Sequence, residues 1–320
     1  MKTVIITGAA GFLGSHLCEN YLNQNFNVIG LDNLATGSRA NIDYLEKLNK
    51  SFKFFDFDVT FNWDKVLNQI PQEHLKNLKY IFHFASPASP PHYQRLALET
   101  LWVNTTGLNN ALITADQFEA KVIFASTSEV YGDPSCSPQP ETYWGNVNSF
   151  GERSCYDEAK RFGEALIFSH NKKYLKKHGL VRIFNTYGPR MNPNDGRVVI
   201  NFILQATKNE PITVYGDGLQ TRSFCYVDDL IKGIICYADK NLDFPINLGN
   251  QNEFNMLALA DVVKKVTQST SPITFHPLPS DDPKQRRPNT TLAEQMLDGW
   301  KPQVQLEEGI SKMAKWLKTL

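Results

Sequence analysis

The sequence has no excess of charge and no apolar run long enough to span a bilayer. Lys plus Arg and Asp plus Glu each number 33 among 320 residues, so nothing in the composition favours nucleic acid or an anionic membrane as a partner. We therefore expect a small-molecule ligand, with no nucleic-acid or membrane partner. The N-terminus has one lysine before "VIITG", which predicts a cytoplasmic protein without a signal peptide.

The sequence also lacks the cysteine and histidine patterns of disulfide-bonded and metal-binding proteins. Its five cysteines are an odd number and include no C-x-x-C pair, which is typical of reduced thiols in a cytosolic chain. The histidines, including His16 and His83, have no ligand-like spacing. We expect neither a disulfide nor a metal site.

What is present is an alternation of apolar and amphipathic segments. The expected strands are 3–7, 27–32, 52–58, 80–85 and 121–126, and the expected helices are 12–24, 94–115, 154–176 and about 305–319. This alternation predicts an α/β fold, a Rossmann-type doubly wound parallel sheet with helices on both faces.

Beyond the segment 180–190 the regular alternation loosens, and Pro, Gly and Asp become frequent. We predict a dinucleotide-binding Rossmann domain at 1–180 and a smaller C-terminal substrate-binding lobe at 181–320. The boundary is soft, because some elements of the second half are expected to return to the first.

A glycine-rich motif, "TGAAGFLGSHL", follows the first expected strand and opens a helix. Glycine permits a tight turn and a close approach of backbone N–H groups to a pyrophosphate, which the helix N-terminus also favours. The spacing is G-x-x-G-x-x-G. We assign cofactor binding to five residues of this motif: Gly8, Gly11, Phe12, Leu13 and Gly14.

Asp32 ends the next expected strand, where a carboxylate would hold the adenosine ribose hydroxyls. It would also repel a 2′-phosphate, and no arginine follows before Arg39, so NAD is favoured over NADP. Asn33 is included in the cofactor site. Asp58 and Val59, at the end of the third expected strand, are predicted to meet the adenine.

Tyr156 and Lys160, in "SCYDEAKRFGEAL", are four residues apart and project from one face of an expected helix. An ammonium beside a phenol favours the phenolate, so the tyrosine becomes a usable base near neutral pH. Both residues are also assigned to the cofactor site.

The combination of these motifs resembles the extended short-chain dehydrogenase/reductase family, also called the NAD-dependent epimerase/dehydratase family. Within it, the chain is most similar to UDP-glucuronate decarboxylases (UDP-xylose synthases). The blocks that carry this resemblance are "FASPASPPHYQ", "STSEVYGDP", "YWGNVN", "RSCYDEAKR", "RIFNTYGPRM", "DGRVV", "NFILQA", "VYGDGLQTRSFCYVDDL" and "DDPKQRRP".

The resemblance implies an NAD-dependent lyase that converts UDP-glucuronate to UDP-xylose through a UDP-4-keto sugar. Thr127 would bond the reacting sugar hydroxyl, and Tyr156 would take its proton. Oxidation at C4 makes the C6 carboxylate a β-keto acid, which loses carbon dioxide. NAD is reduced and regenerated within the cycle.

The residues after Thr127 favour this reaction over water loss. Related 4,6-dehydratases have Asp-Glu there, whereas this chain has Ser128 and Glu129. Serine is a poor general acid, so the pair needed to expel water is missing.

The resemblance also implies a substrate site and an assembly. Arg222 would meet the sugar carboxylate, for which a guanidinium has matching geometry. The resemblance further implies a homodimer through the helix of Tyr156 and the segment 94–115. The residues implied to hold the UDP moiety are Asn185, Arg190, Arg197, Tyr215 and Arg286.

Two alternatives stay open. The first is another nucleotide-sugar enzyme of the same family, either a UDP-uronate 4-epimerase or a 4,6-dehydratase. The second is a non-catalytic nucleotide-sensing protein that kept the fold, which the presence of Thr127, Tyr156 and Lys160 disfavours.

Overall fold

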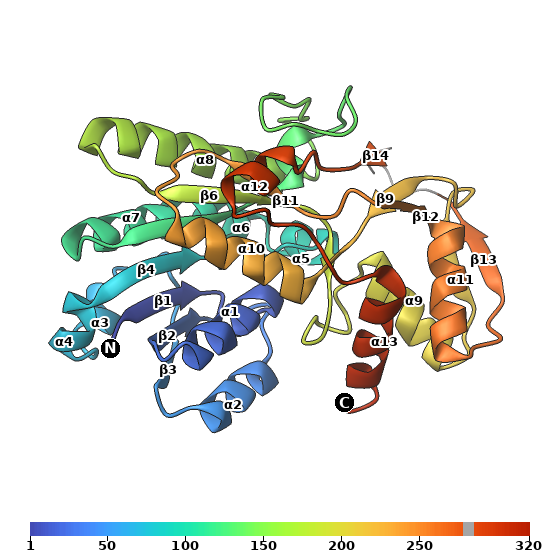
Figure 1. The fold of residues 1–320 in the computed structure, drawn as a ribbon, viewed down its shortest axis with the longest axis horizontal. Coiled ribbons are helices and arrows are strands. Elements are labelled where there is room, and N and C mark those ends of the chain that lie inside the picture. Colours follow the sequence, from blue (N-terminus) through green and yellow to red (C-terminus); the bar gives the residue numbers. More distant parts are fainter. Residues whose placement is uncertain (278–284) are drawn as a thin grey trace. The chain divides into compact units, whose positions relative to one another are not determined.

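The computed structural model describes residues 1–277 and 285–320, which form two compact units (Figure 1). The first unit comprises 1–127, 149–182 and 234–245, and the second comprises 128–148, 183–233 and 246–320. The first four residues of the motif "DDPKQRRP" lie outside the described residues. The assignment of a cofactor domain to 1–180 and a substrate lobe to 181–320 stays a prediction.

The first unit contains six strands of the large parallel sheet, in the order β6-β5-β4-β1-β2-β3. Helices α1 and α2 pack against β1, β2 and β3, and α7 and α8 pack against β4 and β5. This arrangement confirms the predicted Rossmann-type α/β fold. The elements are β1 (Thr3–Thr7), α1 (Phe12–Asn23), β2 (Asn27–Asp32), α2 (Arg39–Leu48), β3 (Phe52–Asp56), α3 (Asp64–Leu67), α4 (Gln72–Lys76), β4 (Leu78–His83), α5 (Pro90–Arg95), α6 (Ala97–Trp102), η1 (Val103–Gly107), α7 (Leu108–Gln117), β5 (Lys121–Thr127), α8 (Ser154–Tyr174) and β6 (Gly179–Ile183).

The central strands are apolar because both of their faces are covered. Every residue of β1 and β2 is buried, as expected for the interior of a parallel sheet. In the strand register Thr7 lies opposite Leu31 on one side and His83 on the other. The carboxyl ends of these strands therefore share one edge, where ligands of such sheets bind.

Three expectations about element boundaries were wrong. The strand expected at 80–85 spans Leu78–His83. The segment 94–115 is not one helix, because α6 passes into the π-helical turn η1 before α7 begins. The third strand ends at Asp56, two residues before Asp58. The Asp58 carboxylate accepts hydrogen bonds from the N–H and the hydroxyl of Thr60, at 2.9 and 2.7 Å, and this local turn competes with further strand pairing.

The second unit is built around small sheets, with strand orders β12-β9-β14, β13-β8 and β10-β7. No helix in the described part of the chain is long and apolar enough to cross a membrane. The remaining elements are η2 (Ser128–Tyr131), β7 (Thr186–Tyr187), α9 (Val198–Thr207), β8 (Ile212–Tyr215), β9 (Thr221–Ser223), β10 (Cys225–Tyr226), α10 (Val227–Asp239), β11 (Ile246–Leu248), β12 (Glu253–Asn255), α11 (Met256–Thr267), β13 (Ile273–His276), β14 (Gln285–Arg286), α12 (Thr291–Met296) and α13 (Leu306–Leu317).

Candidate active site

The glycine motif forms the turn between β1 and α1, where side chains are excluded. Gly8 has a φ of +74°, and a Cβ there would lie 2.7 Å from the carbonyl oxygen of Phe84. A Cβ on Gly14 would lie 1.9 Å from the Gly8 carbonyl oxygen. Helix α1 begins after Gly11, which gives it no side-chain cap. The turn thus leaves backbone donors at a helix N-terminus, as pyrophosphate binding requires.

Asp32 ends β2 and is held against this turn by backbone donors. Its carboxylate accepts the N–H of Ala10 at 3.0 Å and the N–H of Leu34 at 2.8 Å. Burial raises the pKa of Asp32, and the two N–H bonds oppose that rise. Because a carboxylate has about four acceptor positions, two remain for ribose hydroxyls.

The residues around Asp32 fit a dinucleotide. A Cβ on Gly37 would lie 3.1 Å from Asp32 Oδ1, so glycine keeps this cradle open. Its position in "NLATG" was the only sequence signal for this missed residue. The Asn33 side-chain amide donates to the Asp58 carboxylate at 3.3 Å, and Val59, the next residue in the chain, is buried.

Arg39 is the first arginine after Asp32, and it is already engaged on its own helix. Its guanidinium forms ion pairs with Asp43 and Glu46, each at 2.8 Å. These carboxylates compete with any phosphate for the guanidinium. The preference for NAD over NADP stays a prediction.

Tyr156 and Lys160 lie on α8 against the carboxyl-terminal half of β5. The Lys160 ammonium donates to the Ala125 carbonyl at 2.7 Å and lies 5.6 Å from the centre of the Tyr156 ring. That ring stacks on Tyr93 with centroids 5.0 Å apart. Thr127, the last residue of β5, is buried. The spacing therefore brings the predicted base and ammonium together, as expected.

His83 is a buried structural residue at the end of β4. Its Nε2 donates to the Val103 carbonyl at 2.8 Å, and its Nδ1 accepts from the Thr7 hydroxyl at 3.2 Å. Thr7 is free to donate because its oxygen accepts the N–H groups of Phe84 and Ala85. Burial lowers the pKa of His83 to about 3, so the imidazole is neutral.

Folding also brings two histidines together with a carboxylate, which their spacing in the sequence does not predict. The imidazoles of His170 and His178 lie 3.1 and 3.5 Å from the Asp116 carboxylate, and the Lys176 ammonium lies 3.3 Å from it. His178 Nδ1 accepts the N–H of Val122 at 3.0 Å, which leaves the ring proton on Nε2. That nitrogen, 3.5 Å from Asp116 Oδ1, therefore carries a proton and does not offer a lone pair to a metal.

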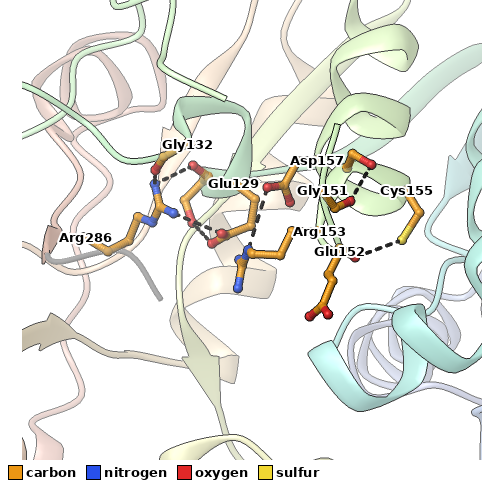
Figure 2. A network of polar contacts seen from close by, with 10 residues as sticks. Glu129, Gly132, Gly151, Glu152, Arg153, Cys155, Asp157 and Arg286 are labelled. Carbon is orange, nitrogen blue, oxygen red and sulfur yellow. Dashed lines mark hydrogen bonds and ion pairs between the residues drawn. The ribbon is translucent and has the colours of Figure 1, made fainter. Parts of the chain in front are cut away.

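In the second unit, Arg286 binds the segment that follows β5 (Figure 2). Its Nη1 donates to the carbonyls of Ser128 and Gly132, at 3.0 and 2.9 Å, and its Nη2 lies 2.9 Å from the Glu129 carboxylate. The guanidinium is buried. The Ser128 hydroxyl donates to Glu129 at 3.3 Å. Figure 2 also shows, in the first unit, Arg153 pairing with Asp157 at 3.8 Å.

Arg222 lies directly opposite Arg286 in the register of β9 and β14. Glu129 neutralises charge at this level of the sheet through its ion pair with Arg286. One Arg222 donor bonds the Thr221 carbonyl at 2.8 Å.

The other predicted substrate residues lie in loops and strand ends of the second unit. Asn185 and Arg190 flank β7, and Arg190 has a left-handed φ of 67°. Arg197 precedes α9 and pairs with the buried carboxylate of Asp195. Tyr215 ends β8, is 46% exposed, and therefore offers an accessible ring.

Comparison with known proteins identifies the family. A model of the NAD dependent epimerase/dehydratase family matches residues 4–249. The chain belongs to this family. Membership confirms the resemblance expected from the glycine, "TSEVYG" and "YDEAK" motifs.

The chain is also similar, over nearly its whole length, to individual proteins with specific names. UDP-glucuronic acid decarboxylase 1 of Arabidopsis thaliana is 44% identical over 310 residues, which cover 97% of this chain and 68% of that protein. The protein of the same name from Danio rerio is 43% identical over 315 residues, 98% of this chain and 72% of that one.

Solved structures of the family share the fold over the whole chain. UDP-glucose 4-epimerase of Thermotoga maritima, solved with UDP-glucose, has a TM-score of 0.89 at 27% identity and 99% coverage of both chains. UDP-glucuronic acid 4-epimerase of Bacillus cereus, solved with UDP-glucuronic acid and NAD, has a TM-score of 0.86 at 27% identity and the same coverage.

Proposed function

We propose that the protein is an NAD-dependent carboxy-lyase that converts UDP-glucuronate to UDP-xylose and carbon dioxide. The observation that carries this proposal is the similarity, over 97% of the chain, to a relative named UDP-glucuronic acid decarboxylase. The buried Tyr156–Lys160 pair supports it, because sugar oxidation needs a base of this kind.

The cofactor is NAD, held by the turn of Gly8, Gly11 and Gly14 and by the carboxylate of Asp32. Phe12, Leu13, Asn33, Asp58 and Val59 complete this assignment. When bound, NAD supplies a reversible hydride acceptor for C4 of the sugar. The protein supplies orientation, proton transfer and stabilisation of charge.

Proton transfer at the C4 hydroxyl is the task of three residues. Tyr156 removes the proton, and the Lys160 ammonium favours the phenolate that does so. Thr127 donates or accepts a hydrogen bond at the same hydroxyl and so orients it. The resulting 4-ketone lies β to the C6 carboxylate, whose C–C bond electrons can then move into an enolate.

The carboxylate end of the sugar is assigned to Ser128, Glu129 and Arg222. Arg222 binds the carboxylate, while Glu129 acts at C5, where the enolate takes up a proton after carbon dioxide leaves. The ion pair with Arg286 holds Glu129 in place. Ser128 stands where dehydratases of the family carry the acid that expels water.

The UDP moiety is assigned to five residues of the second unit. The cations of this set meet the diphosphate, for which a guanidinium is well suited. Tyr215 packs on the uracil, because its ring is accessible. The set is Asn185, Arg190, Arg197, Tyr215 and Arg286.

A UDP-uronate 4-epimerase is the second candidate function. The specific observation in its favour is the fold similarity, over 99% of the chain, to an epimerase solved with UDP-glucuronic acid and NAD. An epimerase would use the same Thr127, Tyr156 and Lys160 chemistry but would keep C6.

Incubation of the purified protein with UDP-glucuronate and NAD separates the two functions. A UDP-pentose and an equal amount of carbon dioxide are expected. UDP-galacturonate without carbon dioxide would establish the epimerase instead. Binding of UDP-glucuronate with no product would mean a nucleotide-sensing protein.

We further propose a cytoplasmic homodimer. Large apolar side chains are exposed on α6, α7 and α8, including Trp102 at 56% and Phe168 at 67%. Exposed apolar residues gathered on neighbouring helices are typical of protein interfaces. A second copy of this chain is the proposed partner.

A further inference from the structure

A partly buried ion pair ties α8 to the two strands beside it. The Glu164 carboxylate accepts two hydrogen bonds from the guanidinium of Arg182 on β6, at 2.9 Å from Nε and 2.7 Å from Nη2. It accepts a third, at 2.6 Å, from the Ser126 hydroxyl on β5. The side chains of Glu164 and Arg182 are 16% and 11% exposed. A bidentate pair of this kind fixes direction as well as distance.

On both β5 and α8, the residues of this contact lie close in the chain to the proposed proton-transfer residues. On β5, Ser126 stands between Ala125, which binds Lys160, and Thr127. On α8, Glu164 follows Lys160 by four residues, and Lys160 follows Tyr156 by four, so the three side chains share one face of the helix.

The helix is also unusually close to β5 at this level. A Cβ on Gly163 would lie 2.6 Å from the Phe124 ring. Close packing sets the distance between α8 and β5, but smooth apolar contact does not prevent the helix from sliding along the strand. The directional bonds of Glu164 supply that restraint.

We propose that Glu164 is a positioning residue for the reaction. Its carboxylate, oriented by Arg182 and bonded to Ser126, holds α8 in register with β5 and thereby sets Tyr156 and Lys160 relative to Thr127. This inference rests on the proposed function, because it assigns Glu164 a part in the same proton transfer.

The test compares Glu164→Gln and Ser126→Ala with Glu158→Gln as the matched control. Glu158 lies on the same helix, is 37% exposed, and pairs with Arg161 at 3.7 Å. In the protein saturated with NAD, Glu164→Gln should lower kcat for UDP-glucuronate about tenfold, which equals about 1.4 kcal/mol. KM should stay within about twofold.

Ser126→Ala keeps the Glu164–Arg182 pair and so guards against a folding defect. It should lower kcat about threefold and lower the melting temperature by only a few degrees, because only one hydrogen bond is lost. Glu158→Gln should leave kcat unchanged. Equal kcat in all three variants would overturn the proposal. So would a decrease in kcat of Glu164→Gln that is no larger than the unfolded fraction of that variant explains.

A second readout does not need turnover. Ultraviolet difference titration of each NAD-bound protein against its Tyr156→Phe counterpart follows ionisation of Tyr156 alone. A displaced ammonium favours the phenolate less, so Glu164→Gln should move this ionisation to higher pH by about half a unit or more. No movement would overturn the positioning role. If wild-type protein forms no product, the proposed function fails, while this titration still decides the inference.

Discussion

At the scale of single residues, Lys160 combines a proposed role in proton transfer with a cost to stability. Its ammonium is buried, and burial lowers its pKa to about 7. The same residue in an unfolded chain has a pKa near 10.4. Between these values the unfolded chain binds a proton that the folded chain does not, so this group makes stability rise with pH across that window.

Lys160→Met should therefore stabilise the protein while removing its activity. At pH 7 the free energy of unfolding should increase by about 2 kcal/mol. Each unit by which burial lowers the pKa of Lys160 costs about 1.4 kcal/mol, and loss of the bond to Ala125 offsets part of the total that the substitution regains. The gain should shrink toward pH 10. Denaturant unfolding at both pH values measures it, with Lys172→Met, at an exposed position of α8, as the control. A gain independent of pH, or a loss at pH 7, would contradict this prediction.

Residue spacing could predict local pairs but not distant ones. The four-residue interval between Tyr156 and Lys160 placed both on one helical face, and the structure brings them together. Arg286 was expected at the UDP moiety, and nothing in the sequence linked it to Glu129, 157 positions away. The cluster of Asp116, His170 and His178 was hidden for the same reason.

At the scale of elements, Gly163 lets α8 approach β5 closely. Alanine is favoured over glycine in a helix by about 1 kcal/mol. An added Cβ would meet the Phe124 ring at 2.6 Å, however, and overpacking of this kind costs about 1 to 3 kcal/mol. The cost of overpacking against the Phe124 ring should exceed the gain in helix propensity, because Gly163 and Phe124 are both buried.

Gly163→Ala should thus lower the free energy of unfolding by about 1 kcal/mol, measured by denaturant titration. Catalytic turnover should fall as well, because the Phe124 ring also contacts the Lys160 ammonium at 4.7 Å. Ser169→Ala, at an exposed position of the same helix, should change stability by less than about 0.5 kcal/mol. A stabilised Gly163→Ala protein would show that the helix moves away without cost.

Element types were predictable where apolar patterning was continuous, and boundaries were not. The strand at 3–7 and the helix from residue 12 lie where the pattern placed them. The helix expected at 94–115 is interrupted by η1, whose Val103 carbonyl binds the buried His83 from β4. Such a break depends on a residue 20 positions away, which helical periodicity does not reveal.

At the scale of the whole molecule, the exposed apolar side chains of α6 and α8 predict self-association. The protein should elute with twice the chain mass of 36.3 kDa, measured by light scattering. Phe168→Asp should give a monomer, because burial of a charge opposes the interface. Phe275→Asp, at a residue 58% exposed on β13, is the matched control and should remain dimeric. A monomeric wild-type protein, or equal behaviour of both variants, would contradict the proposed interface.

The most direct test of the whole account follows deuterium placed at C4 of UDP-glucuronate. If the sugar is oxidised at C4, decarboxylated and reduced again without cofactor exchange, each carbon dioxide released should accompany one UDP-xylose that retains deuterium at C4. Reduced nicotinamide should not accumulate. Mass spectrometry of the product measures the label. The account would be contradicted if carbon dioxide were released while the deuterium was lost to solvent, or if no carbon dioxide were released.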